Sequence, residues 1–299
     1  MPSFPAINDI KAADMTKKLK IHWGNFWKYR FLLKELVRKN VRLQYRNSSL
    51  GMLWSLVQPL LFSLVLGFVF STLLGGNDPD GIPRILYILS GRLLYSFFSE
   101  STQGAMRSVR QNSGIIKKVY VPKYIYPMST VFSRFVTFGF SLVILVGFIV
   151  YFNIKDGYSY GLHLRVFFAV VPIMILLVLS MGVGLLLSSI SVFFKDTEFI
   201  YSVLCQLLFY VSPVIFSIDD IRFGGSTPAG DLLTTILRIN PLYGILKMFR
   251  TAIFTSPDMD VPFFYSTGQL FGTAAVAAAV LLLSAFIFHR QQNKFILHI

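Results

Sequence analysis

The sequence predicts an all-α, polytopic membrane protein, because of its composition, its long apolar segments and the placement of its charges. Of its 299 residues, 54% are hydrophobic and 14% are charged, whereas a soluble protein carries about 25% charged residues. Apolar segments of about 20 residues, long enough to cross a bilayer as helices, recur along the chain. The net charge of +14 lies mainly on one side of these segments, which favours membrane topology over nucleic-acid binding as its explanation.

The chain before the first span, residues 1–49, is expected to be a cytoplasmic region with no cleaved signal peptide, because it has no early apolar segment. Its residues 17–46 form a basic amphipathic stretch, with an apolar stripe that includes Leu32, Leu33 and Leu36. Such a stretch is typical of a helix lying on the membrane surface, although a helix packed on a protein core has the same pattern. Its direct continuation into a span favours the interfacial helix. The basic side chains at four-residue spacing are Arg30, Lys34, Arg38 and Arg42.

Six transmembrane helices are predicted, and together they form a transmembrane domain over residues 50–289, followed by a cytoplasmic tail, 290–299. The second span contains Arg92 and Glu100, and the fifth ends at Ser212-Pro213. With the N-terminus inside, 19 of the 28 Lys and Arg residues lie on the inner side, so both termini are predicted to be cytoplasmic. The spans are 50–74, 84–104, 127–152, 166–190, 198–216 and 267–289.

Two loops stand out. The cytoplasmic loop 105–126 has five basic residues and no acidic residue, and a short helix is predicted within 115–121. The external loop 217–266 is apolar, and we expect its segments 231–241 and 242–254 to be short re-entrant helices at the membrane face. Irregular backbone at that depth needs cover from protein or from a water-filled cavity.

Three ionisable residues fall within the spans: Arg92, Glu100 and Arg134. Eight helical residues, about 12 Å, separate Arg92 from Glu100, so these two cannot pair with each other within one helix. Each needs another partner, and either an interhelical ion pair or a transport role fits such a group. Arg134 lies close to the inner surface and is expected to snorkel towards it.

Small residues predict close helix contacts in the fourth span (Ser180, Gly184 and Ser188) and in the sixth (Gly268 and Gly272). The chain also carries 30 Phe and 14 Tyr. Aromatic rings can stack on sugar rings, although contact with lipid or packing is the simpler interpretation for any single one of these side chains. Candidates for lining a channel on the first and fifth spans are Trp54, Phe62, Phe209, Tyr210 and Phe216.

Chemistry that would mark an enzyme is scarce. No GxxxxGK[ST] phosphate-binding loop occurs, so the chain is not expected to bind ATP itself, and the single cysteine, Cys205, cannot form a metal cluster. Asp258-Met-Asp260 matches the DxD pattern of glycosyltransferases. It falls in the external loop, where solvated acidic residues are the simpler interpretation. No cofactor or metal is expected in this chain.

Four stretches, in order, resemble the permease subunits of ABC-2 type exporters that carry O-antigen, capsule or wall teichoic acid. The first, KNVRLQYRNSSLGMLWSLVQP over 39–59, is similar to the basic helix and the opening of the first span. The second, NSGIIKKVYVPKYIYP over 112–127, is similar to the first cytoplasmic loop. The others are Phe194-Lys-Asp-Thr-Glu198 with Ser212-Pro213, and Asn240-Pro-Leu-Tyr with Arg250.

The resemblance implies a homodimeric half-transporter driven by two copies of a separate P-loop ATPase, which would hold ATP and Mg²⁺. It implies export of a lipid-linked polymer across the bacterial inner membrane through a channel lined by the first and fifth spans. The basic cytoplasmic loop would dock in the ATPase, and anchorage of this loop on anionic lipid is compatible with docking. The docking residues would be Asn112, Ile115, Ile116, Lys117, Lys118 and Tyr120.

Three alternatives remain open. An ABC-2 permease for a small molecule, drug or lipid would share the interfacial helix and the basic loop. A membrane-embedded glycosyltransferase or acyltransferase would need catalytic acids, and only Asp258 and Asp260 are candidates. A channel without an ATPase would have no use for a docking loop.

Overall fold

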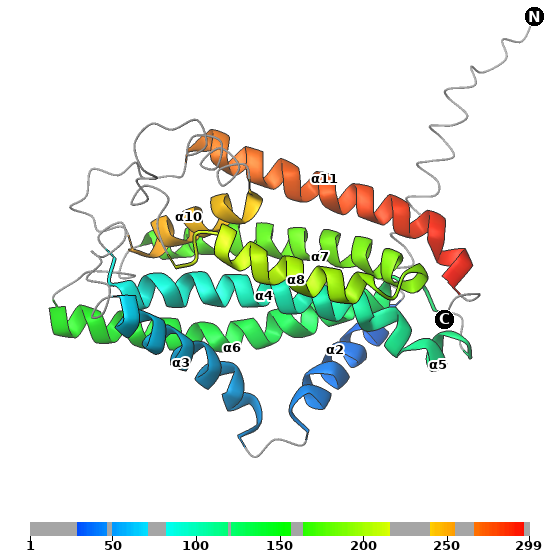
Figure 1. Ribbon diagram of the computed structural model, residues 1–299, viewed down its shortest axis with the longest axis horizontal. Coiled ribbons are helices and arrows are strands. Elements are labelled where there is room, and N and C mark those ends of the chain that lie inside the picture. The colour runs from blue at the N-terminus through cyan, green and yellow to red at the C-terminus, as the bar shows by residue number, and fades with distance from the viewer. Residues whose placement is uncertain are drawn as a thin grey trace, which may run out of the picture.

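The structure is a computed structural model that describes residues 29–46, 50–70, 82–118, 121–156, 164–215, 240–254 and 266–295. All regular structure in these ranges is helical, as the sequence predicts. Figure 1 shows the long helices running side by side, with α10 at one end of the bundle and α5 at the other. The helices are α2 (Arg30–Tyr45), η1 (Gly51–Leu53), α3 (Trp54–Phe68), α4 (Arg84–Gln111), α5 (Ser113–Ile116), α6 (Ile125–Asp156), η4 (Leu164–Ala169), α7 (Val170–Phe193), α8 (Thr197–Val211), α10 (Pro241–Phe254), α11 (Thr267–Gln291) and η5 (Gln292–Lys294).

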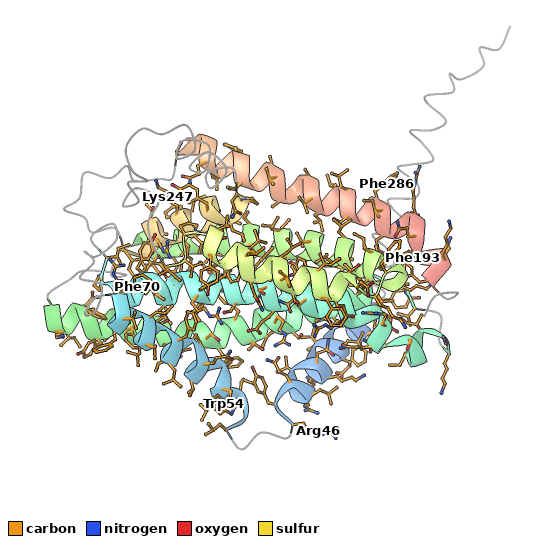
Figure 2. All side chains as sticks on the ribbon, viewed as in Figure 1. Arg46, Trp54, Phe70, Phe193, Lys247 and Phe286 are labelled. Atoms are coloured by element: carbon orange, nitrogen blue, oxygen red, sulfur yellow. The ribbon has the colours of Figure 1, made fainter. Side chains whose placement is uncertain are left out.

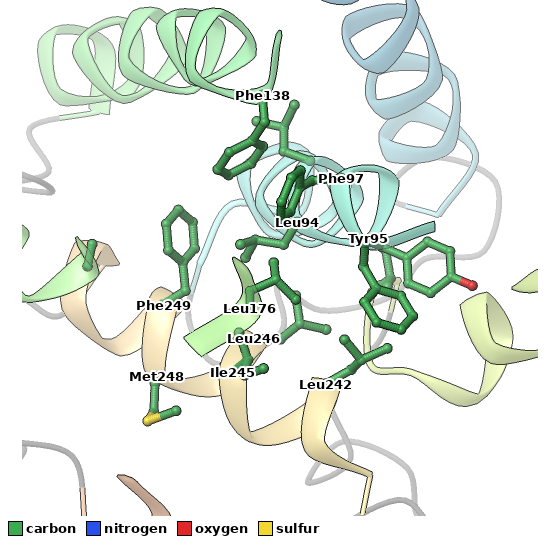
Figure 3. Close-up of a cluster of buried hydrophobic side chains, with 14 of the residues drawn as sticks. Leu94, Tyr95, Phe97, Phe138, Leu176, Leu242, Ile245, Leu246, Met248 and Phe249 are labelled. Atoms are coloured by element: carbon green, nitrogen blue, oxygen red, sulfur yellow. The ribbon is translucent and has the colours of Figure 1, made fainter. Parts of the chain in front are cut away.

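Helix α4 forms the centre of the bundle, since it packs against α3, α6, α7, α8 and α10. Its apolar side chains lie in the main core, where Leu94 and Phe97 meet Phe138 of α6, Leu176 of α7 and Phe249 of α10 (Figure 3). Close packing of such side chains in an interior stabilises the contacts between helices. Helix α4 is therefore enclosed mainly by protein.

Four helical segments are long and apolar enough to cross a membrane: Gly51–Phe68, Ile125–Lys155, Val166–Phe193 and Thr267–Lys294. They match the predicted first, third, fourth and sixth spans. Helix α4 carries charged side chains along its length, which lower its hydropathy, and α8 is apolar but has only 15 residues. The predicted count of six spans, and the domain boundaries drawn from it, stay predictions.

The first span begins with a backbone turn that suits glycine. Gly51 has φ of 53°, in the left-handed region where a side chain is strained. One turn into α3, Pro59 lacks the N–H that would bond to the carbonyl of Ser55 in a regular helix. The Ser141 hydroxyl of α6 donates to that carbonyl at 3.0 Å. The carbonyl that the proline leaves free therefore accepts a hydrogen bond from α6, and this bond joins α3 to α6.

The small residues predicted to mark close helix contacts make such a contact in α7 but not in α11. A Cβ on Gly184 would lie 2.8 Å from the Cβ of Ala105 in α4, so this contact is confirmed. Side chains added at Gly268 and Gly272 would meet no other helix, so the predicted contact in α11 is wrong there. The close contact of α11 is made instead by Gly182 of α7, whose Cβ would lie 2.8 Å from the backbone nitrogen of Leu281.

The external loop contains a helix where one was predicted. Helix α10 covers Pro241–Phe254, and ten of its residues, among them Leu242, Ile245 and Phe249, are buried. Its packing on η4, α7, α11 and α4 gives it the cover of protein that such a segment needs. Re-entry into the membrane stays a prediction, and the expected helix over 231–241 lies almost wholly outside the described residues, as do Asp258 and Asp260.

Candidate functional site

The end of the bundle that is predicted to be cytoplasmic contains both basic elements that the sequence singled out. In α2, the side chains of Arg30, Lys34, Arg38 and Arg42 are exposed, and Arg38 also pairs with Glu35 at 2.7 Å. The apolar stripe of α2 packs on protein, with Leu36 buried and Leu32 and Leu33 against the same cluster. Helix α2 contacts α6, so part of this stripe packs on protein, and the position of α2 at the membrane surface stays a prediction.

The predicted docking loop is organised around α5, which turns back after α4 ends at Gln111. Asn112 closes α4 by donating from Nδ2 to the carbonyl of Ser108 at 2.8 Å. Ile115 is 39% exposed and Ile116 is 7% exposed, so two adjacent isoleucines face opposite ways. Lys117 and Lys118 are exposed. Tyr120 lies outside the described residues.

Ile116 belongs to a cluster that joins several elements at this end of the bundle. Leu36 of α2, Val109 of α4, Val192 of α7 and Phe295 at the chain's C-terminal end pack into it. The Lys123 ammonium donates to the carbonyl of Gln292, and burial lowers the pKa of Lys123 below its ordinary value. The loop, the basic helix and the C-terminal segment are therefore held as one unit.

Glu198, in the first turn of α8, forms a second link. Its carboxylate contacts Arg107 Nε at 3.2 Å and also pairs with Arg110, both near the end of α4. An acidic side chain in the first turn also interacts favourably with the positive end of the helix dipole of α8. The sequence reasoning did not identify this bridge, although an acidic residue at the inner boundary of a basic protein was a usable signal. This bridge ties the end of α4, just before the predicted docking loop, to the start of α8.

The charges within the spans find partners on other helices. Arg134 Nη1 of α6 donates to Glu100 Oε2 of α4 at 3.1 Å. The expectation that Arg134 snorkels is thus corrected, and the interhelical ion pair is the interpretation that holds for these two residues. Arg92 lies over the ring of Phe62 at 4.4 Å and over that of Phe209 at 5.3 Å. A guanidinium over an aromatic face is attracted by the ring's quadrupole.

The predicted channel-lining aromatics separate into two groups. Trp54 on α3 and Tyr210 on α8 are exposed (Trp54 is marked in Figure 2). Phe209 is 8% exposed and packs against Tyr95 at 5.3 Å, while Phe62 is partly buried against the core. Among the four candidates in the described residues, Trp54 and Tyr210 are therefore the two that present an exposed aromatic side chain. Phe216 lies outside the described residues.

At the opposite end of the bundle, Arg250 of α10 joins segments that are distant in the sequence. Its guanidinium donates to the carbonyls of Pro213 at 2.7 Å, Tyr87 at 3.0 Å and Val214 at 3.1 Å. Asn240 Nδ2 donates to the Ser212 hydroxyl at 3.2 Å. The motifs Ser212-Pro213 and Asn240-Pro-Leu-Tyr and the residue Arg250 thus form one cluster. A basic residue among the apolar residues of this segment was the signal for it.

The chain was compared with known proteins. A family model described as ABC-2 type transporter matches residues 32–254. An O-antigen export system permease protein RfbA of Myxococcus xanthus is 25% identical over 273 residues, covering 90% of this chain and 95% of the relative. A protein of the same description from Klebsiella pneumoniae is 24% identical over 79% of this chain and 84% of its own length. The polysialic acid transport protein KpsM of Escherichia coli is 20% identical, over 88% of this chain and 93% of its own length.

The family match covers most of the chain, and it includes the basic helix, the loop around α5, the Glu198 bridge and the Arg250 cluster. The relatives align over most of their own length as well, so the likeness concerns whole proteins rather than one segment. The four candidate spans agree with a multi-pass membrane protein. The chain belongs to the ABC-2 type transporter family of membrane permeases.

Proposed function

We propose that this chain is the transmembrane subunit of an ABC exporter for a lipid-linked polysaccharide or a teichoic-acid-like polymer, in the inner membrane of a bacterium. Two copies of the chain form the channel, and two copies of a separate P-loop ATPase supply the energy. The names of the relatives, which are O-antigen and polysialic acid export proteins, support the cargo class. The ATPase holds ATP and Mg²⁺, since the chain's sequence contains no P-loop.

The observation that carries this proposal is the construction of the cytoplasmic end. An outward-facing hydrophobic residue, Ile115, and two lysines stand on a loop whose inner side, Ile116, is fixed in a core shared with α2, α7 and the C-terminal segment. Apolar anchors flanked by charge are typical of protein docking surfaces. A partner that pushes on this loop moves α2 through the core and α8 through Glu198.

Six spans require that α4 and α8 also cross the membrane. Helix α4 has 28 residues, which span about 42 Å, and it runs beside α6 and α7. Its low hydropathy agrees with its central place, because a helix enclosed by protein need not be apolar enough for lipid. Helix α8 reaches the Arg250 cluster through its end at Ser212-Pro213. With both helices crossing, the two termini lie on the same side of the membrane, and the excess of Lys and Arg on that side supports the cytoplasm.

The channel lies on the faces of α3 and α8 that have no partner within one copy of the chain. Exposed apolar and aromatic side chains line these faces, among them Trp54, Val65, Leu207 and Tyr210. Contiguous apolar surface of this kind marks contact with lipid or with another protein. A second copy placed against these faces encloses an aromatic path for sugar rings.

The proposal is tested by replacing Ile115 with Asp in the tagged, full-length protein and purifying it from its native membranes in mild detergent. We expect the P-loop ATPase that co-purifies with the unchanged protein, identified by mass spectrometry, to be lost. Ile154→Asp is the matched control, since Ile154 is also exposed but lies near the C-terminal end of α6, away from α5. This variant should leave the ATPase bound. Purification of the unchanged protein without any ATPase would contradict the half-transporter.

The cargo needs a separate readout, because docking and substrate choice are independent. Cells that lack this protein should retain the cell-surface glycan inside the cytoplasm, and the unchanged chain should restore it to the surface, whereas Ile115→Asp should not. A normal surface glycan in cells without the protein, together with an intact ATPase complex, would favour an ABC-2 permease for another cargo.

A further inference from the structure

A polar pocket of about 110 Å³ lies where the end of α2 and the start of α3 meet the middle of α4 and α6. It is lined by Arg92, Glu100 and Arg134, together with polar side chains of α2 and α3 such as Gln44 and Gln58. Two arginines and one glutamate leave the pocket with a net charge of +1. Ionisable groups at such a depth are costly and mark a functional site by default.

The ion pair accounts for only one of the two positive charges. Glu100 accepts from Arg134 at 3.1 Å, whereas Arg92 contacts the aromatic faces of Phe62 and Phe209. Arg92 makes these ring contacts, but within the described part of the chain its N–H groups donate no hydrogen bond. A guanidinium with free donors suits a phosphate, to which it can donate two parallel hydrogen bonds.

An apolar groove lies further along the same helices, α3 and α6. The groove has a volume of about 570 Å³ and is lined by Leu60, Leu64 and Phe148, among other apolar residues, and by Gly147. Pro59 and Ser141 line the pocket, whereas Leu60 and Ile144 line the groove. Pocket and groove are therefore separated by less than one turn of either helix.

We propose that the α3–α6 seam binds one anionic phospholipid, with its phosphodiester in the pocket and an acyl chain in the groove. The single negative charge of a phosphodiester matches the net charge of +1, whereas a diphosphate would exceed it. The groove leads from the pocket towards the end of α6 that is remote from α2, so head and tail are separated along the helix axes. The lipid fills the elbow between α2 and α3 and stiffens the joint between them.

The test is native mass spectrometry of the full-length protein, purified in mild detergent and titrated with phosphatidylglycerol or with uncharged diacylglycerol. We expect one tightly bound phosphatidylglycerol per chain and no comparable binding of diacylglycerol. Gly147→Leu should displace the lipid, because a side chain there enters the groove, where a Cβ would meet nothing within 4 Å. Gly139→Leu is the matched control, because Gly139 lies on the same helix and a Cβ there would also meet nothing within 4 Å. Gly139 lines neither the pocket nor the groove, so this variant should leave binding unchanged.

Two charge variants distinguish recognition of the lipid phosphate from a general loss of folding, because they should change the lipid affinity in opposite directions. One charge near a membrane surface is worth about 1 kcal/mol of attraction for an anionic lipid, which corresponds to about a fivefold change in affinity. Arg92→Gln should weaken binding of phosphatidylglycerol by that factor, and Glu100→Gln should strengthen it. Equal losses in both variants, or equal affinity for diacylglycerol, would overturn the proposal. A retained polyprenyl phosphate in place of phospholipid would overturn the choice of occupant.

Discussion

Arg250 shows how one residue organises a whole end of the bundle. It is 5% exposed and its guanidinium lies over the Tyr87 ring at 3.4 Å while it donates to three carbonyls and to the Ser90 hydroxyl. Gly91 is part of this arrangement, because a Cβ there would lie 2.5 Å from Nη2 of Arg250. A buried cation is tolerated only when its donors are satisfied in this way.

Replacement of Arg250 by Ala should destabilise the protein by about 3 kcal/mol or more, because it leaves several buried carbonyl groups without donors. Arg250→Lys should rescue little of this loss, since an ammonium cannot reproduce the planar fork. Thermal unfolding of the purified protein in detergent measures the effect. Lys247→Ala, at an exposed position of the same helix, is the control and should leave the midpoint unchanged. Equal midpoints for both variants would contradict the role given to Arg250.

At the scale of elements, the packing of α11 depends on one glycine of its neighbour. Gly182 of α7 faces the backbone of α11, with its missing Cβ 2.8 Å from the nitrogen and 2.9 Å from the Cα of Leu281. Backbone atoms cannot rotate away as a side-chain end can. Close approach of this kind is the main source of helix association in lipid, where apolar side chains gain little by meeting one another.

Gly182→Ala should therefore lower stability by about 1–3 kcal/mol, as overpacked sites do. Gly272→Ala in α11 offers the opposite case, because its Cβ would meet nothing within 4 Å, and alanine favours a helix over glycine by about 1 kcal/mol. Thermal unfolding midpoints of the two variants should move in opposite directions. A fall in both would mean that the surface around Gly272 is also a packed contact.

At the scale of the whole molecule, a consistent topology follows from six crossings. Lys117, in the predicted docking loop, then lies in the cytoplasm, and Lys247, on α10, lies outside. Both side chains are exposed. The described helices support this arrangement by placing α5 and α10 at opposite ends of the bundle (Figure 1).

Topology is measured with single cysteines in a Cys205→Ser background, since Cys205 is the only cysteine. A thiol reagent that cannot cross membranes should label Lys247→Cys in intact spheroplasts. It should label Lys117→Cys only after the membrane is opened. Labelling of both from the same side would mean that the number of crossings between them is even, and the six-span prediction would be wrong.

The sequence by itself determined the class of structure and its chemistry. Length and hydropathy predicted six spans, and four of them match long apolar helices of the structure, because a bilayer demands continuous apolar helix. The basic faces of α2 and of the loop around α5 are visible in the sequence as clustered charge. The four ordered stretches together indicated the family. Each of these signals is local, so it can be read from neighbouring residues.

The tertiary structure decided which side of each element faces a partner. Only packing shows that Ile116 is buried while Ile115 is exposed, that Arg134 pairs with Glu100, and that α4 needs little hydropathy because protein surrounds it. It alone joins Arg250 to residues more than 30 positions away in the sequence. Such contacts depend on the docking of whole helices, whose register no local pattern encodes, and they set where charge is stable within the membrane.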